Sequence, residues 1–181
     1  AKARGQIDGI LRKAVELGKL QTAEADAASA RLSTTSNVAD ALAEADLIIE
    51  TAPERIDIKM GLFADIERHA RKDAVVASNT SALSITEMAG TLSDPSRVAG
   101  MHFFNPVHKM KLIEIVRALE SSERALTTIE EVSRRMGKET VLVREAPGFI
   151  TTRVNASIGN EAFFMLMEGV ASPRDIDKAL K

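Results

Sequence analysis

Apolar and polar residues alternate along the chain with two different periods, and each change of period predicts a new element of secondary structure. Residues 3–19 and the Ala-rich residues 22–30 have the three-to-four-residue spacing of helices. The short apolar runs at 46–50 and 73–78 are typical of buried strands. Between them, residues 53–72 return to helical spacing, and the proline that opens this segment suits the first turn of a helix.

Strands and helices continue to alternate in the second half of the chain. Strand patterns occur at 97–103, 111–117 and 138–144, and residues 123–137 predict a helix whose inner face extends to Met136. The other predicted elements are a weak strand at 31–35, a helix at 36–45 capped by Ser36, a short helix from Ser84, a turn at 93–96, a long helix at 149–169 and a helix capped by Ser172.

The order of these elements predicts the fold class. Strands that alternate with helices indicate a parallel, doubly wound α/β sheet, and this pattern continues to about residue 145. The rest of the sequence is helical throughout. We therefore expect two domains, an α/β domain at 1–146 and the start of an all-helical domain at 147–181. The sequence opens inside an amphipathic pattern without Met, so we also expect its true beginning to be missing.

Composition excludes several classes of function. The 181 residues contain no Cys, which rules out disulfides, thiol catalysis and thiolate zinc sites, and three His give no pattern typical of a metal site. The net charge of −2 and the lack of Trp and Tyr give no reason to expect nucleic acid as a partner. No segment approaches the ~20 apolar residues of a membrane helix, so we expect no membrane partner.

Polar residues follow three of the predicted strands, at the point where each strand ends. Ligands of open parallel sheets bind beyond the carboxyl ends of the strands, so these residues are candidates for a site. For a single strand, Ser, Asn, Thr and Pro could simply form a loop, but three such clusters at one edge favour a binding site. The candidates are Glu50, Thr51, Pro53, Glu54, Ser78, Asn79, Thr80, Ser81, His102, Asn105 and Pro106.

Glu114 interrupts the apolar strand pattern at 111–117. With a period of two, it shares a face with Leu112 and Val116, away from the flanking cations. The loop before this strand is too short for a parallel return, so the strand ending at His102 should pair with it in antiparallel fashion. Pairing that is symmetric about residue 108 sets His102 opposite Glu114, at the ~4.5–5.5 Å Cβ separation that allows a hydrogen bond.

A paired carboxylate and imidazole support two interpretations. The carboxylate can fix the tautomer of the ring, leave its second nitrogen free as a general base, and stabilise the imidazolium that forms. Alternatively, His102 and Glu114 could be a structural pair that holds two strands together. The position of the imidazole at the ligand edge of the sheet favours the catalytic interpretation.

Three segments of the chain resemble one known family. The sequences ASNTSALSIT (77–86), GMHFFNPVHKMKLIEIV (100–116) and EAPGFITTRVNASIGNEAFFMLMEG (145–169) are similar to those of 3-hydroxyacyl-CoA dehydrogenases, above all the bacterial 3-hydroxybutyryl-CoA members. The resemblance covers essentially the whole chain. It implies a Rossmann-type NAD-binding domain, whose first strand and Gly-rich loop would precede this sequence, followed by the start of a helical domain that completes the substrate site and forms a homodimer.

The resemblance also implies roles for individual residues. His102 matches the catalytic base and Glu114 matches its partner. Ser81 and Asn105 match residues that take part in catalysis and bind both the 3-oxygen region of the substrate and the nicotinamide side of the cofactor.

Further positions match the binding residues of the family. Thr51, Glu54 and Lys59 match positions near the nicotinamide ribose of NAD. Thr152 stands where relatives often carry an Asn that contributes to the active site, and its hydroxyl is the expected replacement donor toward the substrate. Contacts with CoA are not assigned.

The resemblance predicts a cytoplasmic, NAD-dependent oxidoreductase that acts on short-chain (S)-3-hydroxyacyl-CoA. Residues 1–181 alone are expected to be inactive, because the sequence contains no G-x-G-x-x-G loop for the pyrophosphate. The alternative is a non-catalytic, crystallin-like relative that keeps the fold. The presence of both His102 and Glu114 argues against that alternative.

Overall fold

A computed structural model describes residues 2–180, and the chain divides into two compact units, residues 1–41 and 42–181. In the first unit, α1 (Lys2–Glu16) contacts α2 (Thr22–Ala30). The Arg4 guanidinium donates to the Leu32 carbonyl at 3.0 Å, and Ser29 donates to Asp8 at 2.9 Å. These two bonds fix the end of α2 against the first turns of α1. The helix α3 (Val38–Leu42) lies where the two units meet in sequence.

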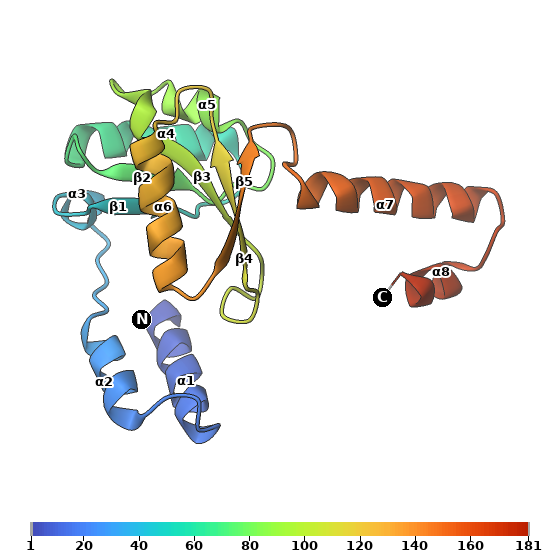
Figure 1. Ribbon diagram of the computed structural model, residues 1–181, viewed down its shortest axis with the longest axis horizontal. Helices are drawn as coiled ribbons and strands as arrows, with labels where there is room; N and C mark the ends of the chain where they lie inside the picture. Colours follow the sequence, from blue (N-terminus) through green and yellow to red (C-terminus); the bar gives the residue numbers. More distant parts are fainter. Residues whose placement is uncertain (1, 181) are drawn as a thin grey trace. The chain divides into compact units, whose positions relative to one another are not determined.

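The second unit contains a five-stranded sheet, drawn in Figure 1. Its strands are β1 (Leu47–Glu50), β2 (Val75–Ser78), β3 (Val98–Phe103), β4 (Leu112–Arg117) and β5 (Glu139–Arg144). They lie side by side in chain order; β1, β2 and β3 are parallel, β4 is antiparallel to β3, and β5 is parallel to β4. The predicted mostly parallel sheet and the antiparallel β3–β4 pair are both confirmed.

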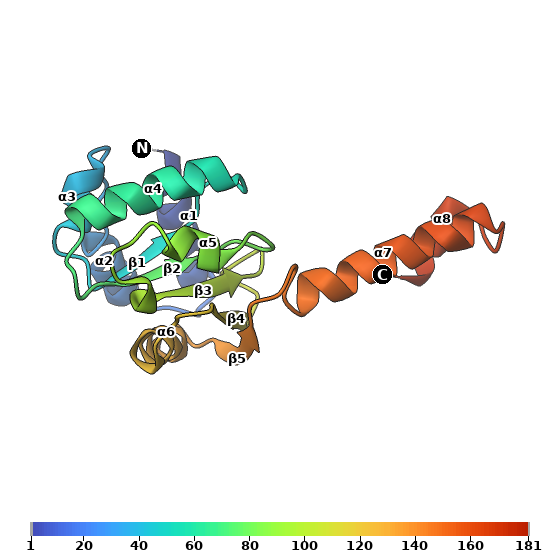
Figure 2. The ribbon, with the colours of Figure 1, turned by 90° about the horizontal axis from the view of Figure 1, so that it is seen from above.

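Helices cover both faces of the sheet, as a doubly wound fold requires. Figure 2 shows α4 (Ile56–His69) and α5 (Ile85–Ala89) on one face and α6 (Glu123–Arg135) on the other. The strands divide their side chains between two apolar clusters, with Val76 and Val116 on the α4 and α5 side and Ala77 and Ile115 on the α6 side. This is the Rossmann-type fold that the sequence predicts.

Beyond β5, the chain turns back along β4 before the next helix. The Glu145 amide donates to the Arg117 carbonyl at 2.9 Å, at the carboxyl end of β4. Four residues later, Phe149 is buried in the cluster that contains Val116, and the Ile150 amide reaches Glu114 near the middle of β4. This return segment ends at α7 (Thr151–Met167), which is followed by α8 (Pro173–Ala179).

The long helix α7 differs from the helices that cover the sheet. No residue of α7 is buried within the described part of the chain, and Phe163 and Met167 are among its most exposed apolar side chains. Ser172 caps α8 as predicted, by accepting from the Asp175 amide. No helix within residues 2–180 is both long enough and apolar enough to cross a membrane.

Several predicted elements differ from the structure. Residues 31–35 form no strand; the Leu32 amide continues the end of α2, and Thr35 accepts from the Asn37 amide. Asn37 rather than Ser36 caps α3, by accepting from the Ala39 amide at 3.1 Å. A polar segment with no apolar face has more to gain from these local bonds than from pairing in a sheet.

The start of α4 and the inward orientation of Met136 were also predicted wrongly. The helix α4 begins at Ile56 rather than at Pro53, because the backbone of Ala52 is bound to Glu50 and Lys59 and holds the preceding loop out of helical conformation. Met136 is the C-cap residue of α6 and is 48% exposed, so it does not face inward. Gly137 ends this helix as predicted, with the positive φ of +70° that favours glycine.

Candidate active site

A buried ion pair organises the carboxyl ends of β1 and β2. Lys59, from the second turn of α4, donates to both oxygens of Glu50 at 2.8 and 2.9 Å and to the Ala52 carbonyl at 3.1 Å. Ser78, at the end of β2, donates to Glu50 at 2.6 Å. A charge in the interior is costly unless it is paired and hydrogen-bonded, so moving either loop would leave a buried charge without a partner. The network therefore fixes the loops that follow both strands.

Glu54 connects these two loops at the surface of the network. Its carboxylate accepts from the Thr80 hydroxyl at 2.5 Å and from the Ser81 amide at 2.8 Å, and it lies 3.5 Å from the Lys59 ammonium. Partial burial acts to raise the pKa of Glu54, but the bonds from Thr80 and Ser81 and the charge of Lys59 outweigh it and lower the pKa below its usual value. Glu54 is therefore held as an exposed anion beside Ser81.

The end of β3 is tied to the loop after β2. The Asn79 side chain accepts from the Phe103 amide at 2.8 Å, one residue beyond His102. Asn105 and its cis peptide bond to Pro106 lie in the loop that follows, where Asn105 is exposed. Asn79 thus sets the direction in which β3 delivers His102 and Asn105 to this edge.

His102 and Glu114 face one another across the β3–β4 pair. Their Cα atoms are register partners, as the symmetry about residue 108 predicts. The Nδ1 atom of His102 lies 2.7 Å from Oε2 of Glu114, and both side chains are buried. A carboxylate at this distance favours the tautomer in which Nδ1 carries the proton.

Glu114 has a second set of partners at the start of α7. Its Oε1 atom accepts from the Ile150 amide at 3.2 Å and from the Thr151 amide at 3.0 Å, and its Oε2 atom accepts from the Thr151 hydroxyl at 3.2 Å. Free amides at the first turn of a helix favour a negative charge. The imidazole is therefore one of several groups that make the buried carboxylate tolerable.

Aromatic rings enclose the imidazole. The ring centroids of Phe104 and Phe149 lie 4.7 and 5.7 Å from that of His102, and Phe149 is nearly edge-on. The Nε2 atom of His102 makes no hydrogen bond with any residue from 2 to 180, and it is not among the buried atoms without a partner. This nitrogen is the one polar atom of the pair that stays free for a substrate.

The other candidate residues at the carboxyl edge differ in how far they are buried. Lys59 is fully buried, so its ammonium acts on Glu50 and Glu54. The side chains of Thr51, Ser81 and Asn105 make no hydrogen bond within residues 2–180, and all three are at least partly exposed at the carboxyl edge. Their polar atoms are therefore accessible to a ligand.

Thr152 is a predicted site residue, whereas its neighbour Thr151 is not. Thr151 contacts Glu114, whereas Thr152 lies in an open depression with Pro147 and Arg153 and makes no side-chain hydrogen bond within the described residues. Position within a helix alone does not distinguish two adjacent threonines. The break at Pro147-Gly148 was the available signal that a helix start, with its free amides, lies close to the strands.

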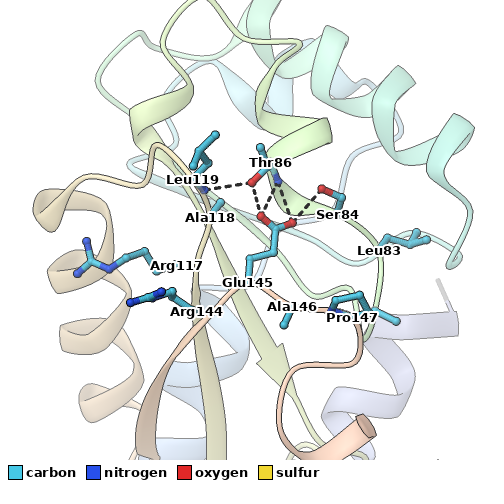
Figure 3. Close-up of a pocket in the computed structure, with 11 residues that line it drawn as sticks. Leu83, Ser84, Thr86, Arg117, Ala118, Leu119, Arg144, Glu145, Ala146 and Pro147 are labelled. Carbon is cyan, nitrogen blue, oxygen red and sulfur yellow. Dashed lines mark hydrogen bonds between the residues drawn. The ribbon is translucent and has the colours of Figure 1, made fainter.

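Glu145 was also missed, and it belongs to a different part of the unit. Its carboxylate accepts from Ser84 and from the amide and hydroxyl of Thr86, so it caps the first turn of α5, as Figure 3 shows. These residues line an open pocket of about 570 Å³ together with Arg117 and Arg144. None of the residues predicted for the site lines this pocket, so it is separate from the candidate chemistry.

The groups at the carboxyl edge fit one end of a dinucleotide. An anionic carboxylate, free hydroxyls and an amide are suitable partners for a ribose and a carboxamide, and they follow three neighbouring strands. The 181-residue sequence contains no G-x-G-x-x-G, so the residues described here are candidates for the nicotinamide end. Fold and site together define an α/β domain of the dinucleotide-dependent oxidoreductase class.

Comparison with known proteins identifies the family. Residues 1–146 match the model for the NAD binding domain of 3-hydroxyacyl-CoA dehydrogenase, and residues 148–181 match that for its C-terminal domain. The chain belongs to the 3-hydroxyacyl-CoA dehydrogenase family, and the description of its matched domain gives NAD as the cofactor.

Individual relatives support this assignment. The chain is 43% identical over 151 residues to a probable 3-hydroxyacyl-CoA dehydrogenase of Caenorhabditis elegans, covering 83% of this chain and 51% of that protein. It is 39% identical over 180 residues to the 3-hydroxybutyryl-CoA dehydrogenase of Clostridioides difficile, covering 99% of this chain and 64% of that protein. The chain thus spans between about half and two thirds of the length of these relatives.

A solved structure has the same fold. The (S)-3-hydroxybutyryl-CoA dehydrogenase PaaH1 from Ralstonia eutropha superimposes with a TM-score of 0.88 at 36% identity, covering 92% of this chain and 59% of that one. The agreement extends the family assignment from sequence to three-dimensional arrangement.

Proposed function

We propose that this protein catalyses the NAD-dependent oxidation of short-chain (S)-3-hydroxyacyl-CoA, such as 3-hydroxybutyryl-CoA, to 3-ketoacyl-CoA, and the reverse reaction. The observation that carries the proposal is the arrangement of His102: Glu114 occupies its Nδ1 atom, and its Nε2 atom is free at the ligand edge of the sheet. The names of the relatives from Clostridioides difficile and Ralstonia eutropha favour a short acyl chain.

In the proposed mechanism, the chain's own residues transfer the proton and bind the substrate oxygen. The Nε2 atom of His102 accepts the proton of the 3-hydroxyl group, and Glu114 stabilises the imidazolium that results. NAD, when bound, supplies the hydride acceptor. Ser81 and Asn105 donate to the substrate oxygen, and in the reverse direction His102 returns the proton to it.

The cofactor end of the proposed site depends on the network around Lys59. Glu54 and Thr51 are exposed where they can bind a ribose hydroxyl, and Thr152 is the proposed donor toward the substrate. Lys59 is buried, so we assign it the role of holding Glu54 in position instead of direct contact with the cofactor.

The direct test is the oxidation of NADH with acetoacetyl-CoA by the full-length protein, followed at the absorbance of NADH. Wild-type protein should turn over, and His102→Gln should lower kcat by roughly 10²–10⁴ while NADH still binds. A folded wild-type protein that binds NADH but shows no turnover would favour the non-catalytic, crystallin-like alternative. Residues 1–181 alone should show no activity in the same assay.

We also propose that the protein is a homodimer through its helical segment. The exposed apolar side chains of α7, among them Phe163 and Met167, support this proposal, because exposed apolar surface often marks interaction sites. Sedimentation of the full-length protein should give the mass of two chains, and a monomer at micromolar concentration would contradict the proposal.

A further inference from the structure

Thr151 binds both oxygens of one carboxylate. Its amide donates to Oε1 of Glu114 at 3.0 Å, and its hydroxyl donates to Oε2 of the same group at 3.2 Å. Oε2 is also the atom that lies 2.7 Å from Nδ1 of His102. The imidazole and the threonine hydroxyl therefore share one acceptor atom. Because Thr151 binds both carboxylate oxygens, it restricts the rotation of the Glu114 carboxylate about its side-chain bond.

The turn before α7 has an unusual backbone that directs these donors. Gly148 has φ +74° and Phe149 has φ +50°, and positive φ is uncommon for a residue with a side chain. A Cβ atom on Gly148 would lie only 3.0 Å from the Arg153 amide nitrogen, and the positive φ would strain any other residue, so this position favours glycine. Strained backbone of this kind collects at functional sites, where surrounding contacts hold it in place.

The same turn brings a second group to the imidazole. Phe149 is buried, and its ring lies nearly edge-on to that of His102, with centroids 5.7 Å apart. One short segment thus contacts both members of the pair, His102 through an aromatic ring and Glu114 through two amides and a hydroxyl. The strands supply the two reactive side chains, and the start of α7 fixes their orientation.

We propose that Thr151 is a positioning residue for the His102–Glu114 pair, and that the start of α7 sets the orientation of the base through Glu114. The effect on catalysis rests on the proposed function. The coupling of Thr151 to His102 through Glu114 rests on geometry alone. It assigns to the threonine a role that is separate from that of Thr152, which does not contact Glu114.

A purely structural interpretation makes a different prediction. If Glu114 merely caps α7, loss of the Thr151 hydroxyl would weaken the helix start and leave the imidazole unchanged. If Thr151 positions the pair, the same loss would be detected at His102. Within the described chain, the charged group that contacts His102 is Glu114 from β4. The loop after β3 contributes Phe104, the return segment contributes Phe149, and the start of α7 contributes only amides and a hydroxyl.

The test uses Thr151→Val, which keeps the shape of the side chain and the backbone amide and replaces the hydroxyl with a methyl group. Proton NMR of the full-length protein should show the Nδ1 proton of His102 exchanging with water about 10-fold faster in this variant, while Thr151→Ser restores the wild-type rate. Thr128→Val is the matched control, because the Thr128 hydroxyl donates to the Arg124 carbonyl in α6 at 2.8 Å. An unchanged rate in folded Thr151→Val, or a serine variant as fast as the valine variant, would overturn the proposal.

A second measurement needs no variant and therefore does not depend on folding of the mutants. In the wild-type chain, the amide resonances of Ile150 and Thr151 should follow the protonation of His102 recorded from its own ring nitrogens. The exposed His69 and His108 serve as internal references in the same spectra. Amide resonances that do not respond to His102 would contradict the coupling.

Turnover separates the two proposals. In the full-length protein, Thr151→Val should lower kcat about 10-fold, leave the KM for NADH within about two-fold, and recover with serine. If the wild-type protein shows no dehydrogenase activity but the NMR coupling is present, the proposed function fails and the positioning role stands. If activity is present and the coupling is absent, the proposed function stands and the positioning role of Thr151 fails.

Discussion

The two ends of the sheet each carry a cluster of buried charge, and within residues 2–180 the side-chain nitrogen that lacks a hydrogen-bond partner is buried at one end but not at the other. At the amino ends of β2 and β3, Arg97 donates to the carbonyls of Arg71 and Ala74 and to Glu67, and its Nε atom is buried without a partner. At the carboxyl ends, His102 is held by Glu114, and its second nitrogen is free. The first cluster is closed, and the second can accept a ligand.

This difference shows which property identifies the site. Hydrogen bonds from Lys72, Ser93 and Arg97 lower the pKa of Glu67 to about 2, a larger perturbation than that of Glu54 at the carboxyl edge. A perturbed pKa alone would therefore place the active site at the amino ends of the strands, because structural ion pairs shift pKa values as catalytic ones do. A free nitrogen at the ligand edge is the better criterion.

The largest expected effect separates the two clusters by turnover. In the full-length protein, Glu114→Gln should lower kcat by roughly 10²–10⁴, because the amide cannot stabilise an imidazolium. Glu67→Gln, the matched change at the amino end, should leave kcat unchanged. Steady-state kinetics with acetoacetyl-CoA and NADH measure both variants. Near-normal turnover in Glu114→Gln would show that the cluster at the carboxyl ends is no more catalytic than the one at the amino ends.

The second effect concerns stability. Lys59→Met leaves Glu50 buried without its cation and should reduce the free energy of unfolding by about 3–5 kcal/mol. Adding Glu50→Leu should recover part of this loss, because it removes the unpaired carboxylate but leaves the Ser78 hydroxyl and the Ala52 amide without their acceptor. Urea denaturation measures both variants, and a loss below about 1 kcal/mol for Lys59→Met would show that the pair is better solvated than its burial implies.

Arg97→Met should cost less, about 1.5–3 kcal/mol. Glu67 keeps Lys72 and Ser93 as partners after this change, and its side chain is 21% exposed. The same denaturation experiment ranks the two ends of the sheet, and a larger loss for Arg97→Met than for Lys59→Met would reverse the ranking.

The amino-end cluster should also show a defined pH dependence. The pKa of Glu67 is about 2 in the folded chain against an ordinary value of 4.5, so its contribution to stability is complete above pH 4.5 and is lost as the pH falls toward 2. Glu67→Gln should therefore destabilise the chain at pH 6 and make almost no difference at pH 2. Urea midpoints across this range test the prediction, and a destabilisation that is independent of pH would contradict it.

The smallest effect is expected at the surface. Arg134 and Glu130 form an exposed pair in α6 at 3.2 Å, one helical turn apart. Glu130→Gln should change the free energy of unfolding by less than about 0.5 kcal/mol, because water and salt screen such pairs. A loss comparable with that of Arg97→Met would show that burial is not what distinguishes the clusters.

Much of the fold could be predicted from the sequence, because short apolar runs and helical spacing alternate clearly. The pairing of His102 with Glu114 was also accessible, since a short loop dictates an antiparallel return and an acid in an apolar strand requires a partner. These inferences depend on local patterns or on a single loop.

The contacts that were missed depend on tertiary structure. Thr151 is 37 positions from Glu114 in sequence, and no local pattern reports that a helix starts beside a strand. Lys59 resembles an ordinary solvated lysine on a helix, and only the packing of α4 against β1 reveals that it is buried on Glu50. The misplaced start of α4 has the same origin, because this ion pair holds the loop after β1 away from the helix.

The return segment between β5 and α7 restricts how the sequence can change in length. It must connect Arg117 at one end of β4 with Glu114, three residues along the same strand, while burying Phe149 between them. An insertion or deletion at 146–149 would move the donors of α7 out of register with the carboxylate. Homologous chains should therefore keep the same number of residues in the return segment.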